Sequence, residues 1–337
     1  MQLNFETIKA ITCGVVSVTE QPEGILFHRF TDEQTELYRK KREDFYYKTM
    51  ACSGVKLCFR TNSQNLSVKF FVESVYARHF MCLEVFADGK CVGCIDNYSG
   101  RVLPREYADL DFPLGEFSGE FCLGEGVKQV SIYLPWNMKT LLQELSVDDG
   151  AFVEPVKPTK TLLALGDSIT QGYDALLPSR RYAGRLAEAL GVEEINKAIG
   201  GERFCPDLAA LRDDFDPDYI LVAYGTNNWS ATTRKEFDTN VVAFFENLEQ
   251  NYPGVKTFVL TPIWRSNLDM ETDFDSFFYI EEGIRQAIGG RENMILIPGF
   301  DFVPHSIDFF SDYGLHPNNE GFDNYFENLL KAIKKHI

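Results

Sequence analysis

A serine and a histidine in the second half of the chain are the side chains best suited to covalent chemistry. Ser168 lies in Gly166-Asp167-Ser168, directly after the apolar run 161–165, and His316 lies on a polar loop in front of Pro317. A serine hydroxyl is a poor nucleophile until a base takes its proton, and histidine is such a base. A serine at the exit of a buried strand also lies at the carboxyl edge of a sheet, where open α/β folds place their sites.

Two further segments complete a pattern along the chain. They are Asn196-Lys197-Ala198-Ile199-Gly200-Gly201 and Tyr224-Gly225-Thr226-Asn227-Asn228-Trp229. With the serine and histidine segments, and in this order, they resemble the four sequence blocks of the SGNH (GDSL-type) hydrolases, a family named for Ser, Gly, Asn and His. In this chain those residues are Ser168, Gly201, Asn227 and His316, and the resemblance extends from near Lys160 to the end of the chain.

The resemblance implies a serine esterase. Ser168 would attack the ester carbonyl, and His316 would take and return the proton. The resulting oxyanion needs preplaced donors, and the family supplies them from the backbone N–H of Ser168, the backbone N–H of Gly201 and the side-chain amide of Asn227. Glycine at position 201 leaves room for the carbonyl oxygen to approach. No metal or organic cofactor is expected for this chemistry.

The histidine block departs from the family's pattern. SGNH hydrolases usually have Asp-x-x-His, whereas here position 313 is Tyr and the nearest acid, Asp312, stands four residues before His316. A bulge or tight turn at Gly314 would absorb the extra residue, and Asp312 would then orient His316 through Nδ1. In the alternative, a backbone carbonyl orients the histidine and the site is a Ser–His dyad. We favour Asp312 as the third member.

The elements expected to position these residues alternate along the second half of the chain. Apolar runs predict strands at 161–165, 193–198, 219–223, 256–260 and 294–297. Between them, helical patterns occupy 181–190, 207–214, 234–250, 276–288 and 320–335. This alternation is typical of an α/β fold with a parallel sheet and helices on both faces, and the resemblance implies its flavodoxin-like form.

The first half of the chain has a different pattern. Short alternating runs predict strands at 54–60, 66–70, 80–86, 127–133 and 141–147, with one short helix at 33–45. Many short strands separated by turns indicate an antiparallel sandwich or jelly roll. The segment 154–159 contains two prolines and is interpreted as a linker. We therefore predict an all-β accessory domain at 1–156 and a catalytic SGNH domain at 157–337.

This two-domain arrangement is similar to the acetyl esterases of carbohydrate esterase family 2. The segments Leu134-Pro135-Trp136-Asn137 and 261–265 look like the same subgroup. The resemblance implies a short acyl group, expected to be acetyl, on a sugar hydroxyl. Four side chains near the motif blocks are candidates for lining the acyl or sugar site, with a packing role as an equal alternative: Tyr173, Trp229, Trp264 and Arg265.

Composition narrows the possible partners. The 337-residue chain has 45% hydrophobic residues and a net charge of −17 at pH 7. An acidic surface of this kind repels nucleic acids and anionic membranes, so the expected partner is an acylated small molecule or oligosaccharide. The sequence shows neither a secretory signal nor an apolar run of membrane-spanning length, which predicts a cytoplasmic protein. It does not indicate an oligomeric state.

Several other polar residues are interpreted as structural. The eight cysteines are expected to be reduced thiols, and Cys91 and Cys94 are placed on the second strand of a hairpin rather than in a metal site. Asp167 is expected to bond the backbone of its own turn. Two other functions remain open: a lipid-type acylhydrolase or acyl-CoA thioesterase on the same machinery, and a non-catalytic glycan-binding protein.

Overall fold

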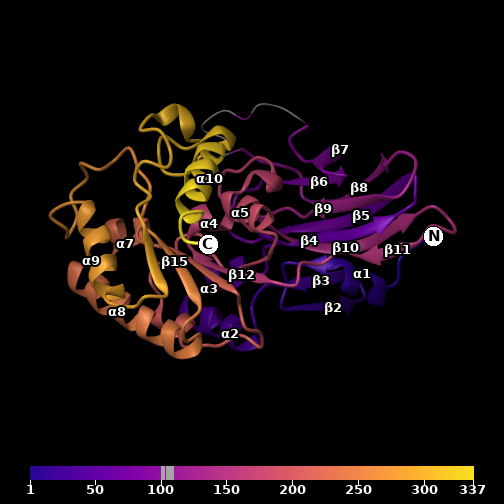
Figure 1. The fold of residues 1–337 in the computed structure, drawn as a ribbon. Helices are drawn as coiled ribbons and strands as arrows, with labels where there is room; N and C mark the ends of the chain where they lie inside the picture. The colour runs from indigo at the N-terminus through magenta and orange to yellow at the C-terminus, as the bar shows by residue number, and fades with distance from the viewer. Residues whose placement is uncertain (100–102, 104–109) are drawn as a thin grey trace.

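Two antiparallel sheets from the first half of the chain and a parallel sheet from the second half form the framework of the described structure (Figure 1). This computed structural model describes residues 1–99, 103 and 110–337. The strands of the antiparallel sheets lie between Thr12 and Pro155, and those of the parallel sheet lie between Thr161 and Ile297. The predicted change from antiparallel to alternating α/β structure is therefore confirmed.

The antiparallel sheets pack face to face as a jelly roll. One has the strand order β2-β3-β10-β5-β8, and the other has the order β1-β4-β9-β6-β7 with β11 paired to β4. Within them, β3-β10-β5-β8 and β4-β9-β6-β7 are the two four-stranded sheets of that fold. The bounds are β1 (Thr12–Cys13), β2 (Ser17–Gln21), β3 (Gly24–His28), β4 (Lys56–Thr61), β5 (Asn65–Ser74), β6 (Cys82–Ala87), β7 (Lys90–Asp96), β8 (Gly115–Cys122), β9 (Lys128–Tyr133), β10 (Met138–Val147) and β11 (Val153–Pro155).

Alternating side chains from both sheets fill the core of the jelly roll. On β5, Leu66, Val68, Phe70 and Val72 are buried, and the residues between them are not. They share one apolar cluster with residues of the opposite sheet such as Leu57. The two-residue period of a strand with one buried face explains why this region was recognisable as β structure. The predicted hairpin of Cys91 and Cys94 is formed by β6 and β7.

All neighbouring strands of the second sheet are parallel, in the order β13-β12-β14-β15-β16. Counted from β12, this is the order 2-1-3-4-5 of a flavodoxin-like sheet. The expected α/β fold is confirmed. The strand bounds are β12 (Thr161–Gly166), β13 (Glu193–Asn196), β14 (Tyr219–Ala223), β15 (Lys256–Leu260) and β16 (Met294–Ile297).

Helices cover both faces of the parallel sheet (Figure 1). Leu163 and Leu165 of β12 pack in one apolar cluster with α8 and α9, whereas Leu162 and Ala164 pack in a second cluster with α5 and α10. In the described part of the chain, no helix is long and apolar enough to cross a membrane. The helix bounds are α4 (Ser168–Gln171), α5 (Tyr182–Leu190), α6 (Pro206–Ala209), α7 (Thr226–Ala231), α8 (Arg234–Asn251), α9 (Phe278–Ile288) and α10 (Asn319–Ile333), with 3₁₀ turns η2 (Pro178–Arg180) and η3 (Ile307–Phe309).

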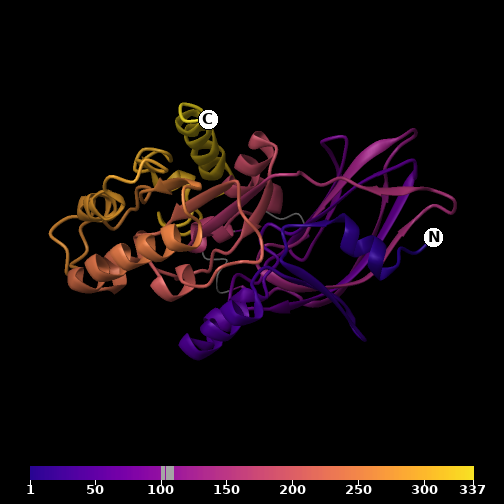
Figure 2. The same cartoon turned by 60° about the horizontal axis from the view of Figure 1, so that its bottom comes forward.

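Three helices precede β4, and two of them pack against the parallel sheet's half of the molecule. They are α1 (Phe5–Ile11), α2 (Asp32–Lys41) and α3 (Glu43–Thr49). Figure 2 shows α2 and α3, in violet, where the sandwich and the α/β part meet. Phe30, Tyr38 and Phe45 belong to the same apolar cluster as Leu163 and Leu165. The early segment thus contributes to the core of the later half. The domain boundary proposed after residue 156 stays a prediction.

A buried arginine ties the early segment to the parallel sheet. The guanidinium of Arg29 donates to the carbonyl oxygens of Ala51 at 2.5 Å, Lys48 at 3.0 Å and Asn196 at 2.5 Å. Asn196 is the last residue of β13, directly before the Gly200-Gly201 loop. Burial lowers the pKa of Arg29 to about 10, which still leaves the side chain charged at neutral pH. The interaction therefore fixes the start of a motif loop from the opposite half of the chain.

Two helix predictions differ from the structure for identifiable reasons. The helix predicted at 33–45 is two helices, because Arg42 has an extended backbone with φ −161°. The helix predicted at 207–214 ends at Ala209, and Asp213 instead forms a buried ion pair with Lys197. The early helix α1, the short helices α4 and α7 and the β2–β3 hairpin were not predicted. Short elements carry little periodicity, so their sequences do not reveal them.

We expect Arg29→Leu to destabilise the protein without changing its fold. The change leaves buried carbonyl oxygens without their charged donor, which should lower the free energy of unfolding by roughly 2–4 kcal/mol. Urea unfolding followed by tryptophan fluorescence measures this loss. Arg60→Leu is the matched control, since Arg60 lies on the surface opposite Glu154 at 3.8 Å and its loss should change stability by less than about 0.5 kcal/mol. Equal stability of the two variants would contradict the role given to Arg29.

Candidate active site

The loop after β12 presents Ser168 at the carboxyl edge of the parallel sheet. Asp167 caps α4 by accepting a hydrogen bond from the Ile169 backbone N–H at 3.0 Å, as expected for a structural residue of this turn. Ser168 is the first residue of this four-residue helix. Gly166 is required by space, because a Cβ atom there would lie 2.4 Å from Oγ1 of Thr170. Burial raises the pKa of Asp167 to about 7.

His316 connects Ser168 to Asp312. The Oγ atom of Ser168 lies 2.8 Å from Nε2 of His316, and Nδ1 of the same ring lies 2.5 Å from Oδ2 of Asp312. All three of these predicted residues are thus brought together, although Ser168 and His316 are 148 positions apart. The contact at Nδ1 is made by the carboxylate of Asp312, as the triad alternative requires.

The turn between Asp312 and His316 accommodates the additional residue. Tyr313 and Gly314 both have left-handed backbones, with φ 64° and 112°. The other carboxylate oxygen of Asp312 accepts hydrogen bonds from the backbone N–H groups of Leu315 at 3.2 Å and His316 at 2.8 Å. Two consecutive positive φ angles fold the chain back on itself, so that a four-residue spacing still places the carboxylate beside the ring. The expected turn at Gly314 is present.

The electrostatics of this pair favour proton uptake by the histidine. Burial by itself would lower the pKa of His316, but the charge and hydrogen bond of Asp312 raise it, and the charge of Asp174 adds to the increase. The net pKa of His316 is raised. Burial likewise opposes ionisation of Asp312, but the hydrogen bonds and charge of His316 outweigh it and lower its pKa. The carboxylate therefore remains ionised and stabilises an imidazolium.

The predicted oxyanion donors follow β12, β13 and β14. Asn227 lies in the first turn of α7, directly after β14, and its Nδ2 donates to the carbonyl oxygen of Glu202 at 3.0 Å. An amide has two N–H groups, so one remains for a ligand. Gly201 has φ 86°, a left-handed backbone that favours glycine. A Cβ atom there would make only ordinary contact with Phe45, so backbone conformation explains this glycine better than space does.

The structure also distinguishes Gly201 from its neighbour Gly200. The backbone N–H of Gly200 donates to Oε1 of Gln171 at 2.7 Å, and its carbonyl oxygen accepts from Nζ of Lys48 at 2.9 Å. Among the described residues, the N–H of Gly201 has no hydrogen-bond acceptor. Gly200 is therefore held in the loop by two bonds, and the N–H of Gly201 is left for a ligand.

The four predicted substrate-lining residues lie in different surroundings. The Tyr173 ring lies 5.3 Å from that of His316. Trp264 is half-buried and stacks on His305. Trp229 is only 2% exposed and packs in the core. Arg265 is buried and donates to the carbonyl oxygen of Thr226 at 2.9 Å. Trp229 and Arg265 thus offer little surface to a substrate here, and the binding roles of Tyr173 and Trp264 stay predictions.

Two charged residues beside His316 were not identified from the sequence. Asp174 is fully buried with Oδ2 3.7 Å from Nδ1 of His316, and Arg78 donates to Asp174 at 2.7 Å. The position of Asp174, six residues after Ser168, was the available signal; Arg78 lies in the jelly-roll half and gave none. Asp174, Asp312 and His316 have donor atoms within 4.8 Å of one another. Because the Arg78 guanidinium already lies against both carboxylates, we interpret the cluster as a proton-handling group rather than as metal ligands.

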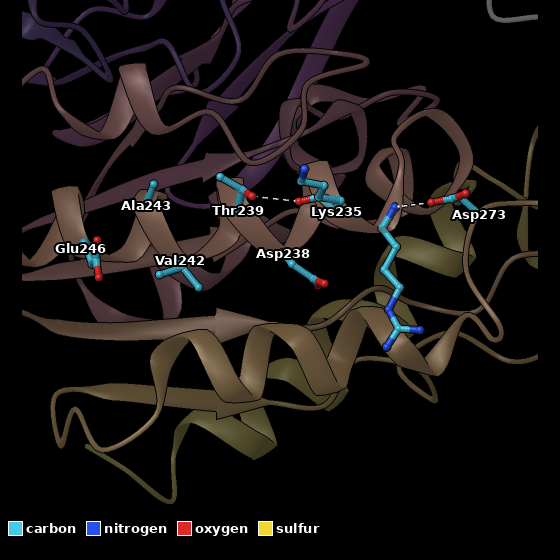
Figure 3. A pocket seen from close by; sticks show the side chains of 8 residues that line it. Lys235, Asp238, Thr239, Val242, Ala243, Glu246 and Asp273 are labelled. Atoms are coloured by element: carbon cyan, nitrogen blue, oxygen red, sulfur yellow. Dashed lines mark hydrogen bonds between the residues drawn. The ribbon is translucent and has the colours of Figure 1, made fainter.

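Two hollows elsewhere on the described surface contain none of the predicted site residues. One, of about 770 Å³, follows the outer face of α8 between Lys235 and Glu246 (Figure 3). Its polar groups bond to each other, as in the contact from Thr239 to the carbonyl oxygen of Lys235. The other, of about 1040 Å³, lies between the two halves and is lined in part by Phe86 and Tyr133. The candidate active site is therefore the sheet edge around Ser168.

A serine, a histidine and a carboxylate at the carboxyl edge of a flavodoxin-like sheet, with glycine and asparagine donors on the neighbouring loops, form the arrangement of an SGNH-type hydrolase. Residues 164–323 match the model of the GDSL-like lipase/acylhydrolase family. The protein is a carboxylic ester hydrolase of the SGNH class with an added jelly roll.

Solved structures share the fold over nearly the whole chain. A salicylyl-acyltransferase, SsfX3, from a tetracycline biosynthetic pathway is 21% identical, with 96% of this chain and 94% of that chain covered and a TM-score of 0.78. An acetyl xylan esterase, Est2A, from the rumen bacterium Butyrivibrio proteoclasticus is 16% identical, with coverages of 99% and 98% and a TM-score of 0.61. A family two carbohydrate esterase from Clostridium thermocellum is 15% identical, with coverages of 85% and 93% and a TM-score of 0.63. No curated protein sequence matches.

Replacing Asp312 with asparagine is expected to reduce kcat for ester hydrolysis by about a hundredfold or more. The amide would favour the wrong tautomer of His316 and would not stabilise the imidazolium. Steady-state kinetics with p-nitrophenyl acetate measure the effect, and Asp301→Asn, at an exposed acid beside His305, is the control. A loss smaller than about tenfold would favour a Ser–His dyad.

Proposed function

We propose that the protein is a serine esterase that hydrolyses short acyl esters, acetyl esters above all, on carbohydrate hydroxyls through an acyl-enzyme. The observation that carries the proposal is the continuous hydrogen-bond relay from Ser168 through His316 to Asp312, with distances of 2.8 Å and 2.5 Å. Such a relay activates a serine hydroxyl as a nucleophile. The open donors of Gly201 and Asn227 support the same chemistry.

In the first half-reaction, the Ser168 oxygen attacks the ester carbonyl while Nε2 of His316 takes the hydroxyl proton. Asp312 stabilises the imidazolium that forms. The carbonyl oxygen becomes an oxyanion, which accepts from the N–H groups of Ser168 and Gly201 and from the free amide hydrogen of Asn227. When the carbon–oxygen bond breaks, His316 gives the proton to the departing sugar oxygen, which leaves as a hydroxyl, and the acyl group stays on Ser168.

In the second half-reaction, water takes the place of the sugar. His316 removes a proton from that water, the hydroxide attacks the acyl carbonyl, and the same three donors hold the second oxyanion. The proton then returns to the Ser168 oxygen as the carboxylic acid leaves. Each step uses only groups of this chain, the ester and water.

Aromatic side chains beside the relay support a carbohydrate as the acyl carrier. The Tyr173 hydroxyl lies 3.5 Å from the carbonyl oxygen of Tyr76, and Tyr76 as a whole is 60% exposed. The ring of Tyr47 packs 5.3 Å from that of Tyr76. Tyr76 also has a positive φ of 57°, which is costly for a bulky residue, and strained backbones of this kind cluster at functional sites. Exposed ring faces held in this way suit the apolar face of a sugar ring.

The similar folds of an acetyl xylan esterase and a family two carbohydrate esterase support the same substrate class. The net charge of −17 disfavours polyanionic substrates. We further propose that the protein acts in the cytoplasm, for which the sequence pattern is the support. A lipid-type acylhydrolase, an acyl-CoA thioesterase and a non-catalytic glycan-binding protein are the alternatives that the following measurements separate.

Ser168→Ala should abolish hydrolysis of p-nitrophenyl acetate, leaving at most a few per cent of the activity, with an unchanged melting curve. A fluorophosphonate probe should label the wild-type protein at Ser168 and should not label the variant. The matched control is Ser179→Ala, at a serine outside the relay. Labelling at another residue, or full activity in Ser168→Ala, would overturn the proposed mechanism. Absence of both labelling and hydrolysis in the wild type would favour a glycan-binding protein.

Tyr76→Ala should raise KM for an acetylated oligosaccharide by roughly threefold to tenfold, because one stacked ring is lost. KM and kcat for p-nitrophenyl acetate should stay within error, since this ester has no sugar to stack. Tyr76→Phe is the control that keeps the ring face and should behave as wild type. Equal KM effects on both esters would indicate a structural role instead, and faster hydrolysis of long-chain than acetyl esters would favour the lipid-type alternative.

A further inference from the structure

Asp174 is a buried acid whose position the relay alone does not explain. Its side chain has no exposed surface, and its backbone has a left-handed φ of 71°. It follows α4 on the same loop as Ser168, and its Oδ2 lies 3.7 Å from Nδ1 of His316. Two carboxylates, those of Asp312 and Asp174, therefore lie beside one imidazole nitrogen. A buried carboxylate in this position needs a counter-charge.

Arg78 provides that counter-charge from the jelly-roll half of the molecule. It lies between β5 and β6, and its Nε and Nη2 donate to the two carboxylate oxygens of Asp174 at 2.7 Å and 3.2 Å. The same Nη2 lies 3.5 Å from Oδ2 of Asp312. One guanidinium thus contacts both acids that flank His316, and its planar fork suits two carboxylates in a way that a lysine would not.

The backbone around Arg78 is itself fixed. The amide of Asn137 donates to the carbonyl oxygens of Arg78 and Phe80, and the guanidinium lies 5.6 Å from the centre of the Tyr173 ring. Asn137 immediately precedes β10, a central strand of the sandwich. The backbone position of Arg78 is therefore set by the fold of the β half, whereas its guanidinium bonds to Asp174 on the Ser168 loop.

We propose that Arg78 and Asp174 are positioning residues of the esterase: Asp174 orients the Arg78 guanidinium, and this guanidinium holds the Asp312 carboxylate against Nδ1 of His316. The jelly roll then supplies a part of the proton relay rather than only a surface beside it. This inference rests on the proposed function and extends it to Arg78, which lies outside the family-matched segment.

The charged groups around His316 allow the proposal to be tested by the direction in which the pH profile shifts. Asp312, Asp174 and Arg78 face the ring, Tyr173 packs on it, and Asp167 and Arg265 lie within electrostatic range of the site. The charge of Asp174 raises the pKa of His316 and that of Arg78 lowers it. The acid limb of the kcat/KM profile reports this pKa in the free enzyme. Removing one charge or the other should therefore move that limb in opposite directions.

The test compares Asp174→Asn, Arg78→Gln and Arg78→Lys in full pH profiles with p-nitrophenyl acetate. The acid limb should shift to lower pH in Asp174→Asn and to higher pH in Arg78→Gln. It should stay near the wild-type position in Arg78→Lys, which keeps the charge but loses the fork. All three variants should lower kcat by roughly tenfold or more at little change in KM, because Asp312 is less well held.

The double variant Arg78→Gln/Asp174→Asn should bring the acid limb back toward the wild-type position, because the two charge effects cancel. Arg180→Gln is the matched control: Arg180 also joins two elements through an ion pair, to Asp323 at 2.9 Å, but does not contact His316. Melting curves identify any variant that loses activity by unfolding. Shifts of the same sign in both single variants, or no shift with kcat within twofold of wild type, would overturn the proposal.

A second measurement separates this proposal from the proposed function. Nitrogen-15 NMR titration of His316 follows its protonation without any turnover. The midpoint should fall in Asp174→Asn and rise in Arg78→Gln even if no ester is hydrolysed. Failure of the wild type to react with the fluorophosphonate would refute the esterase. Unchanged NMR midpoints in a reactive enzyme would refute only the positioning roles.

Discussion

The structure depends most on the hydrogen bond between Ser168 and His316, because its two residues come from opposite ends of the parallel sheet's half of the chain. Ser168 lies on the loop directly after β12, and His316 lies on a loop after β16, the last strand. These strands are not neighbours, since β14 and β15 lie between them. The loops must therefore cross the sheet edge to meet, and every strand between them has to be in register. The 2.8 Å contact between Ser168 and His316 therefore depends on the register of the whole sheet and not only on the two loops.

Basic side chains from the first half of the chain hold the loops that make this contact. Arg29 binds the carbonyl oxygen that ends β13, Lys48 binds that of Gly200, and Arg78 binds the carboxylate of Asp174. Each is at least half-buried and bonds to groups of the α/β half. Charge-assisted hydrogen bonds of this kind are stronger and more directional than neutral ones. The jelly roll and its helix pair are therefore a scaffold for the site loops.

Much of the architecture and the central residues were predictable from the sequence, and the reasons are physical. Buried parallel strands such as β12 and β14 are continuous apolar runs, so the sequence marks them clearly. Ser168, Gly201, Asn227 and His316 stand in short local blocks that need no knowledge of tertiary contacts. Arg78, in contrast, acquires its role only when the two halves pack, and the turn at Tyr313 and Gly314 depends on backbone angles that residue types do not specify. The early end of the 207–214 helix has the same cause, a tertiary ion pair between Asp213 and Lys197.

The packing of Phe30, Tyr38 and Phe45 in the core of the parallel sheet has a consequence for the order of folding. These aromatic residues are synthesised before the strands they cover, since β12 begins at Thr161 and β14 at Tyr219. On the ribosome the sandwich can close around its own core, but the helix pair α2 and α3 has no partner until about half of the chain has followed. Such long-range contacts slow folding and leave apolar surface exposed in the meantime. A gene fragment that begins at the linker would consequently encode a parallel sheet that lacks part of the apolar cover on one of its faces.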